Sequence, residues 1–294
     1  MQLCRIDGRE NGRAYYNYFI MGVMMNLYES RKEVLVIMPA YNEENSVERV
    51  LEALEQPEIA AFADVLVIND ASTDRTPLIV KKHGHMLVTH IFNLGYGSAI
   101  QVGYKYAIRR GYKYVIQMDA DGQHDPSNVT VIYERLRQED APDIVLGSRF
   151  LKDSGEYQTS VAKRVAYTIF RFMIRLFTGR KISDPTTGLQ GLSRRAVLYY
   201  SKFNQFDYTY PDANMIMQML LLGFQVVEVP AVMYQRHMGK SMHSGLKPVI
   251  YMFQMTLSIL AVMFRIKVLK EGVPVEKQVE YSQEIMDRAG ERGQ

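Results

Sequence analysis

Short hydrophobic runs alternate with amphipathic stretches along the chain from residue 34 onward. The runs are rich in β-branched side chains and do not alternate polar with apolar positions; they are VLVIM (34–38), VLVIN (65–69), MLVTHI (86–91), YVIQM (114–118) and DIVLG (143–147). This pattern predicts strands that are buried on both faces of a sheet. Because the intervening stretches have helical patterns, we expect an α/β fold with a mostly parallel central sheet flanked by helices.

Polar side chains follow each of the first four predicted strands. The four segments are PAYNEEN (39–45), NDASTD (69–74), FNLGYGSA (92–99) and DADGQHD (119–125). Such residues also make ordinary turns and N-caps. In a parallel sheet, however, ligands bind beyond the carboxyl ends of the strands. Four such segments in succession at one edge therefore predict a polar ligand site.

Asp119 and Asp121 form a D-x-D pair at the end of the fourth predicted strand. On an extended backbone, residues i and i+2 point the same way, so both carboxylates can reach one point. Like charges this close repel unless a cation lies between them, and Mg²⁺ or Mn²⁺ prefers carboxylates together with phosphate oxygens. Gln123 adds an amide oxygen. The alternative is a structural turn or a cap before a helix at Pro126, but the position at a strand end favours the metal.

The glycines of NLGYGSA resemble part of a dinucleotide-binding fingerprint. Ile100 stands where the third glycine should be, and the segment follows the third strand rather than the first. A dinucleotide loop is therefore not expected. We expect instead that glycines such as Gly97 let a backbone approach a ligand closely.

Two acids after the first two strands are candidates for contacts with a nucleoside. Asp70 is suited to a ribose hydroxyl or a base edge, and Glu43 to a nucleobase N–H. Each has a structural alternative. The segment around Asp70 can cap a helix through Ser72 or Thr73, and Glu43 can stabilise a helix dipole.

Composition narrows the class of partner. Hydrophobic residues make up 47% of the chain and charged residues 23%, which is ordinary for a folded globular protein. The formal net charge is only +3, so no nucleic-acid partner is expected. Cys4 is the single cysteine, which excludes a disulfide framework within the chain and suits a reducing cytosol.

Six segments occur in the order typical of family 2 glycosyltransferases. They are PAYNEE, INDASTDRT, NLGYGSA, MDADGQHDP, GSRF and SDPTTGLQGLSR, and the resemblance runs from about Val34 to Arg265. Within that family, the chain is most like the branch that contains polyprenol-phosphate sugar transferases. The resemblance implies a GT-A fold with C-terminal amphipathic helices. It also implies inverting transfer of a sugar from a nucleotide-diphosphate donor with Mg²⁺ or Mn²⁺.

The resemblance also implies roles for single residues on the donor side. The base is lined by Pro39, Tyr41 and Glu43, and Asp70 holds the base or the ribose. The metal and the diphosphate are held by Asp119 and Asp121, with Gln123 as a third metal contact.

Further roles concern the phosphates and the acceptor. Arg149, in GSRF, faces the phosphates of donor or acceptor, and RHMGKS matches a later phosphate-contacting loop through Arg236, Gly239 and Ser241. In that loop, Met242 stands where the lipid-phosphate enzymes often carry lysine. Fixed cations at these positions stabilise the charge that develops on a leaving diphosphate.

A hydroxyl acceptor requires a base, whereas a phosphate acceptor is already ionised near neutral pH. Asp212, in YTYPDA, is the first candidate for this base by resemblance, and Asp184, in SDPTTG, is the second. The structural alternative for Asp212 is N-capping of the helix that begins at Ala213.

Two segments predict a surface that faces a membrane. On a helix, KRVAYTIFRFMIRLFTGRK (163–181) places Arg164, Thr168, Arg171, Arg175 and Thr178 on one narrow stripe beside a broad apolar face. This favours a helix on an anionic bilayer surface over one that is buried against the domain. The uncharged run 248–264 is at the lower limit for a span of about 17–25 residues. Because it contains Gln254, Thr256 and Ser258, we expect a packed or membrane-surface helix.

These observations predict four regions. They are an N-terminal extension (1–30), a GT-A domain (31–235), a phosphate loop with an amphipathic helix (236–268) and a charged tail (269–294). The predicted acceptor is a polyprenyl phosphate or a lipid-linked surface glycan, at the cytoplasmic face of a membrane or on a membrane-protein partner. A sugar-nucleotide-binding scaffold without turnover is one alternative. A nucleotidyltransferase is the other, but it would need a basic, glycine-rich loop where the acidic PAYNEEN stands.

Overall fold

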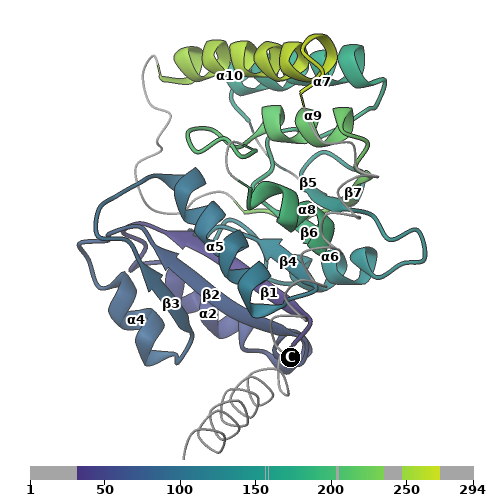
Figure 1. Cartoon of the computed structure of the whole chain (residues 1–294). Coiled ribbons are helices and arrows are strands. Elements are labelled where there is room, and N and C mark those ends of the chain that lie inside the picture. The colour runs from purple at the N-terminus through teal and green to yellow at the C-terminus, as the bar shows by residue number, and fades with distance from the viewer. Residues whose placement is uncertain (1–31, 156, 158, 203–204, 235–246, 272–294) are drawn as a thin grey trace, which may run out of the picture.

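A central sheet runs through the computed structural model, which describes residues 32–271 apart from 156, 158, 203–204 and 235–246 (Figure 1). Within these residues the sheet has seven strands in the order β3-β2-β1-β4-β6-β5-β7. The strands are β1 (Val34–Ala40), β2 (Ala63–Asn69), β3 (Met86–Thr89), β4 (Tyr114–Gln117), β5 (Ile144–Ser148), β6 (Gln190–Ser193) and β7 (Val226–Pro230).

Strand pairing is parallel except at β6. The pairs β1–β2, β1–β4, β2–β3 and β5–β7 are parallel, whereas β6 runs antiparallel between β4 and β5. All five hydrophobic runs form strands, which confirms the predicted α/β fold and mostly parallel sheet. The strands β6 and β7 were not predicted.

A close helix contact explains the unusual sequence of β6, which is QGLS. A Cβ atom at Gly191 would lie 2.1 Å from Cγ2 of Ile132 on the helix that covers this part of the sheet. Glycine therefore makes room for the helix, although it is unfavourable in a strand in other respects.

Helices cover both faces of the sheet (Figure 1). They are α2 (Val47–Leu54), α3 (Pro57–Ala60), α4 (Thr76–Lys82), α5 (Tyr96–Arg110), α6 (Asn128–Leu136), α7 (Val161–Thr178), α8 (Arg194–Tyr200), α9 (Ala213–Leu221) and α10 (Lys247–Met263), which continues as the π-helix η1 (Phe264–Val268).

The strand β1 shows why the hydrophobic runs lack alternation. Leu35 and Ile37 belong to a core that they share with α5, α8 and α9, whereas Val34, Val36 and Met38 belong to a second core shared with α2 and α6. Successive side chains of a strand point to opposite faces of the sheet. Because both faces are covered, every position of this strand except Pro39 is buried.

The helices α7, α9 and α10 form a layer that extends away from the sheet (Figure 1). In α7, Phe170 and Ile174 are completely buried, so part of the predicted apolar face packs into the protein. The opposite part, with Phe172 and Leu176, is exposed. One apolar side of α7 is therefore buried against the protein and another faces outward, and the contact of this helix with a bilayer stays a prediction.

Candidate active site

The loops after β1 and β2 are bonded to each other at the carboxyl edge of the sheet. The Asn42 side chain accepts a hydrogen bond from the backbone N–H of Thr73 at 2.8 Å, and the backbone N–H of Asn42 donates to Ser72 Oγ at 3.0 Å. The backbone N–H of Glu43 donates to Thr76 Oγ1 at 2.9 Å. The loops after β1 and β2 are thus joined to each other at the edge that is predicted to hold a ligand.

Asp70 orders the loop between β3 and α5. Its Oδ1 accepts a hydrogen bond from the backbone N–H of Leu94 and contacts Nδ1 of His90, and its Oδ2 accepts one from the backbone N–H of Gly95. The side chain is almost fully buried. The structure therefore assigns Asp70 a definite positioning role, and its contact with a base or ribose stays a prediction.

Asp119 lies at the end of a chain of buried hydrogen bonds. Tyr104 Oη donates to Gln117 Oε1 at 2.6 Å, Gln117 Nε2 donates to Tyr96 Oη at 2.9 Å, and Tyr96 Oη donates to Asp119 Oδ1 at 3.0 Å. Burial and the nearby charge of Asp119 raise the pKa of Tyr96, so this phenol stays protonated and remains a donor. The carboxylate of Asp119 is thereby fixed in orientation while 31% of the side chain is exposed.

His124 supports the same carboxylate from inside the protein. Its Nδ1 accepts a hydrogen bond from the backbone N–H of Asp119 at 3.1 Å, so the proton of the neutral ring is on Nε2, which lies 3.9 Å from Asp119 Oδ2. Burial lowers the pKa of His124 to about 4, and the ring is therefore neutral at pH 7. His124 interacts electrostatically with Asp121 and also with Arg149 and Asp184.

The D-x-D turn presents oxygen atoms that suit a divalent cation. Asp121 Oδ1 accepts the backbone N–H of Gln123 at 2.9 Å, and Asp119 and Asp121 are both half-buried. Gln123 Nε2 donates to the carbonyl of Tyr234 at 3.3 Å, so its amide oxygen is the end that can act as a ligand. Two carboxylates and one amide oxygen are hard ligands of the kind that Mg²⁺ and Mn²⁺ bind.

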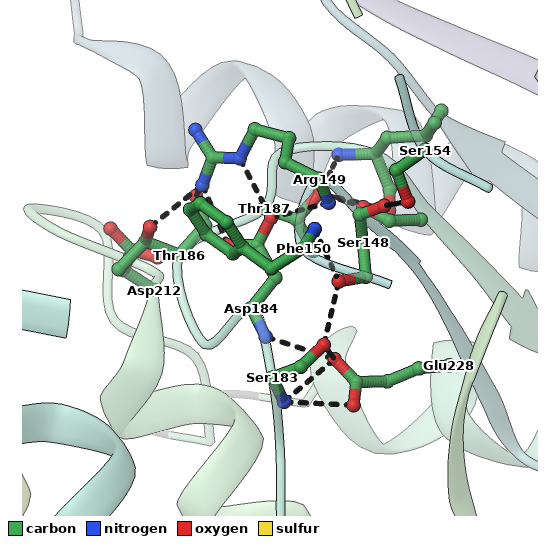
Figure 2. A network of polar contacts seen from close by, with 12 residues as sticks. Ser148, Arg149, Phe150, Ser154, Ser183, Asp184, Thr186, Thr187, Asp212 and Glu228 are labelled. Carbon is green, nitrogen blue, oxygen red and sulfur yellow. Dashed lines mark hydrogen bonds and ion pairs between the residues drawn. The ribbon is translucent and has the colours of Figure 1, made fainter. Parts of the chain in front are cut away.

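Arg149 forms a buried bidentate ion pair with Asp184 (Figure 2). Its Nε and Nη2 donate to the two carboxylate oxygens at 2.7 and 2.6 Å, and Nη2 also donates to Thr186 Oγ1 at 2.9 Å. Burial acts to lower the pKa of Arg149, but the bond and charge of Asp184 outweigh it and raise that pKa. Because Asp184 is completely buried and both its oxygens engage Arg149, its geometry fits a structural anion better than a catalytic base.

Glu228, on β7, holds the loop that carries Asp184 (Figure 2). Its carboxylate accepts hydrogen bonds from the backbone N–H and the hydroxyl of Ser183 and from the backbone N–H of Asp184. Glu228 therefore positions the backbone of Asp184, and the Asp184 carboxylate in turn positions the Arg149 guanidinium. A cation fixed in this way does not have to reorganise when negative charge develops nearby.

Asp212 lies beside this network, near the Arg149 guanidinium (Figure 2). It occupies the N-cap position of α9, but its side chain makes no capping hydrogen bond. Its Oδ2 instead accepts a hydrogen bond from Tyr251 Oη on α10. Burial raises the pKa of Asp212 to about 6, although the Tyr251 bond and the Arg149 charge act to lower it. A carboxylate with this pKa is suited to accept a proton near neutral pH.

The other predicted residues have more varied surroundings. Tyr41 is 48% exposed at the end of β1, next to the half-buried Pro39 and Glu43. A Cβ at Gly97 would lie 2.4 Å from the backbone oxygen of Tyr208, so the close approach at this glycine is to the protein's own chain. The loop residues Arg236, Gly239, Ser241 and Met242 lie outside the described residues, as do the N-terminal extension and most of the tail.

Four residues of this site were not singled out in the sequence. Tyr96 and His124 occur within the quoted motifs, so those motifs carried a signal for them. Glu228 occurs outside every quoted segment and Tyr251 within the uncharged run 248–264, and the roles of both become recognisable only through the contacts that they make.

Comparison with known proteins identifies the family. The sequence model of glycosyl transferase family 2 matches residues 35–199, more than half of the chain. An undecaprenyl-phosphate mannosyltransferase of Micrococcus luteus is 29% identical over 225 residues, which cover 72% of this chain and 88% of that protein. A polyprenol monophosphomannose synthase of Mycolicibacterium smegmatis is 28% identical over 229 residues, which cover 73% of this chain and 82% of that protein.

A solved structure shows the same fold. Glucosyl-3-phosphoglycerate synthase from Mycobacterium tuberculosis, in complex with Mn²⁺, UDP-glucose and phosphoglyceric acid, superimposes with a TM-score of 0.57 at 18% identity, covering 83% of each chain. The chain described here belongs to glycosyl transferase family 2 and is a glycosyltransferase with a GT-A fold. Within the family it is similar to sugar transferases that are named for polyprenol phosphates.

Proposed function

We propose that this glycosyltransferase moves a sugar, with inversion, from a nucleotide diphosphate to a polyprenyl phosphate at the cytoplasmic face of a membrane. The observation that carries the proposal is the arrangement around His124. This buried imidazole accepts the backbone N–H of Asp119, and it also interacts electrostatically with Asp121, Arg149 and Asp184. The carboxylates of the D-x-D pair and a fixed cation are therefore both within electrostatic reach of one buried residue.

The donor side is proposed to comprise the D-x-D turn and the polar loops after β1 and β2. Asp119, Asp121 and Gln123 would hold Mg²⁺ or Mn²⁺, which neutralises phosphate charge when it is bound. Tyr96 and His124 orient Asp119 so that its carboxylate does not have to reorganise. The solved neighbour that contains Mn²⁺ and UDP-glucose is consistent with a donor of this class.

Arg149 is proposed to stabilise negative charge on the phosphates. Its guanidinium is 10% exposed and lies 5.1 Å from the ring centroid of Tyr157 and 5.5 Å from that of Tyr167. The two tyrosine rings and the Asp184 carboxylate fix the orientation of the guanidinium. Because the side chain is little exposed to water, its electrostatic interactions with nearby groups are less screened.

Asp212 is proposed to accept the proton of the acceptor. A phosphate monoester loses its second proton near pH 6, and the pKa of Asp212 is also about 6. The two groups are therefore matched for proton transfer when the acceptor phosphate still carries a proton. A hydroxyl acceptor on a lipid-linked glycan would depend on this carboxylate much more strongly.

A bilayer surface is the proposed partner of α7 and α10, which lie side by side in the outer layer (Figure 1). The described stretch Ile250–Val268 is long and apolar enough to span a membrane, and 17% of it is buried in the protein. Polar contacts from α10 to α9 favour a helix that lies along the surface instead. Exposed Arg164 and Arg175 on α7 would face anionic lipid.

The test is a transfer assay with the full-length protein and labelled UDP-, GDP- and dTDP-sugars. A short-chain polyprenyl phosphate serves as acceptor, and each reaction is run with Mn²⁺ and with a chelator. We expect one donor class to yield a polyprenyl-linked sugar with inverted anomeric configuration, and only with the metal. Nucleotide binding without transfer to any lipid acceptor would contradict the proposal and favour a scaffold without turnover.

A further inference from the structure

The helix α10 and its continuation η1 make a row of polar contacts with α9 and its N-cap residue. Tyr251 Oη donates to Asp212, Ser258 Oγ accepts from Asn214 Nδ2 at 2.9 Å, and Arg265 donates to Gln218. On the α10 side the contacts are seven residues apart. Since seven residues make almost two turns of an α-helix, Tyr251 and Ser258 share one face of α10. Arg265, in η1, extends the row to the same neighbouring helix.

The same helix presents bare hydrophobic side chains on its other faces. Met255 and Ile259 are buried between the polar contacts, whereas the outward positions are 38–64% exposed and comprise Ile250, Phe253, Leu257, Leu260 and Phe264. A surface helix of a soluble protein normally has the reverse arrangement, with polar residues outward. One side of α10 is therefore attached to the protein while the other suits an apolar surface.

The inner face of α10 also contacts the segment that leads into Asp212. Asn214 Oδ1 accepts the backbone N–H of Asp212 at 2.9 Å, and Asn214 Nδ2 donates to Asp207 at 2.7 Å as well as to Ser258. The ring of Tyr210 packs edge-on against Tyr251 with 5.6 Å between centroids. Asn214 thus joins Asp207 and Asp212, the two ends of this segment, to Ser258 of α10.

The contact between Tyr251 and Asp212 differs from the others because it reaches a candidate catalytic group. Charge-assisted hydrogen bonds of this kind are stronger than neutral ones. The Asp212 side chain makes no N-capping hydrogen bond, and the phenol acts on it together with the backbone N–H of Ala213 and the charge of Arg149. The Tyr251 bond is the one of these three contacts that comes from α10.

We propose that Tyr251 is a positioning residue for Asp212, through which attachment of α10 to a bilayer orders the acceptor side of the active site. The inference rests on the proposed function, in which Asp212 accepts a proton and α10 faces lipid. It goes further because it makes sugar transfer depend on the position of α10. Binding of the donor nucleotide does not depend on that position. The occupant of the outer face is an anionic bilayer surface, because the face is apolar and the exposed cations Lys267 and Lys270 lie at its end.

Kinetic measurements on Tyr251→Phe test the positioning role. We expect kcat to fall about tenfold, with an unchanged dissociation constant for the donor nucleotide and Mn²⁺. The acid limb of the pH–rate profile should move to higher pH, because the phenol bond favours the ionised form of Asp212. Ser258→Ala is the matched control, since it removes a contact of the same helix face that does not involve the Asp212 carboxylate. Equal pH profiles for the two variants would overturn the proposal. Tyr251 would then only attach α10 to the rest of the protein.

Hydrogen exchange tests the coupling without requiring activity. Vesicles of phosphatidylcholine and phosphatidylglycerol should slow amide exchange in residues 207–215 of the full-length protein, and Tyr251→Phe should abolish this effect. An identical response in the variant, or no response in the wild type, would overturn the coupling. If the wild type transfers no sugar at all, the proposed function fails, and the exchange data alone decide this inference.

Discussion

The guanidinium of Arg149 and the carboxylate of Asp184 are joined by two parallel hydrogen bonds of 2.7 and 2.6 Å, and Asp184 is completely buried. Removing one partner of such a pair leaves an uncompensated charge in the interior, which is more costly than the pair itself is stabilising. The pair therefore links the stability of the fold to the orientation of a cation in the candidate active site.

Substitution of Asp184 by Asn should lower the free energy of unfolding by about 3–5 kcal/mol. The reason is that Arg149 would keep its charge at a buried position without a matching carboxylate. Urea denaturation measures the loss. The control is Glu134→Gln, which removes an exposed pair with Arg137 and should change stability by less than about 1 kcal/mol. Similar losses in the two variants would contradict the structural role given to Asp184.

Asp121→Asn should remove metal-dependent binding of the donor nucleotide. A nucleotide present at 100 times its dissociation constant stabilises the wild type by about 2.7 kcal/mol, and this stabilisation should disappear in the variant. Thermal shift with UDP, GDP and dTDP, each with and without Mn²⁺, measures it. Asp125→Asn is the matched control, because that acid bonds Ser127 and Tyr234 rather than lying in the D-x-D pair. A response to nucleotide that persists in Asp121→Asn would exclude the proposed metal site.

The activity of the wild type should fall as the pH decreases through about 6. Asp212 accepts a proton only in its ionised form, and burial raises its pKa from the usual 3.8 to about 6. With a hydroxyl acceptor the limb should disappear in Asp212→Asn and the rate should be lower by about 10²–10⁴-fold; with a phosphate acceptor the ionisation of the phosphate keeps a limb near pH 6. A phosphate acceptor predicts a smaller decrease, because it is largely ionised already. A variant with the same rate and profile as the wild type would remove Asp212 from the mechanism.

Leu257→Glu should weaken binding to anionic vesicles at least tenfold, since it places a charge on the apolar outer face of α10 and removes a leucine that would be buried in lipid. Co-flotation of the full-length protein measures the effect. Leu78→Glu is the control. That leucine is 64% exposed on α4, at the opposite end of the molecule from α10 (Figure 1). Equal binding of the two variants would exclude α10 as the lipid-facing surface.

The hydrophobic runs were sufficient to predict β1 to β5, because a strand that is covered on both faces needs apolar residues at every position. The same reasoning did not identify β6, whose sequence is determined by a neighbour. Gly191 is required by the approach of Ile132 on α6, and no local pattern encodes that distance. Nor did it identify β7, which pairs with β5 at the edge of the sheet.

The sequence by itself determined the family, the strands β1 to β5 and the position of Asp119 and Asp121 just after β4, because these depend on short patterns within single segments. Only the tertiary structure decided which acid pairs with Arg149 and which is held by Tyr251. Asp184 and Asp212 are similar in sequence context, yet one is buried against a guanidinium and the other is held by a phenol 39 residues away. Burial and hydrogen-bond partners determine the role of a carboxylate, and both depend on how distant segments pack.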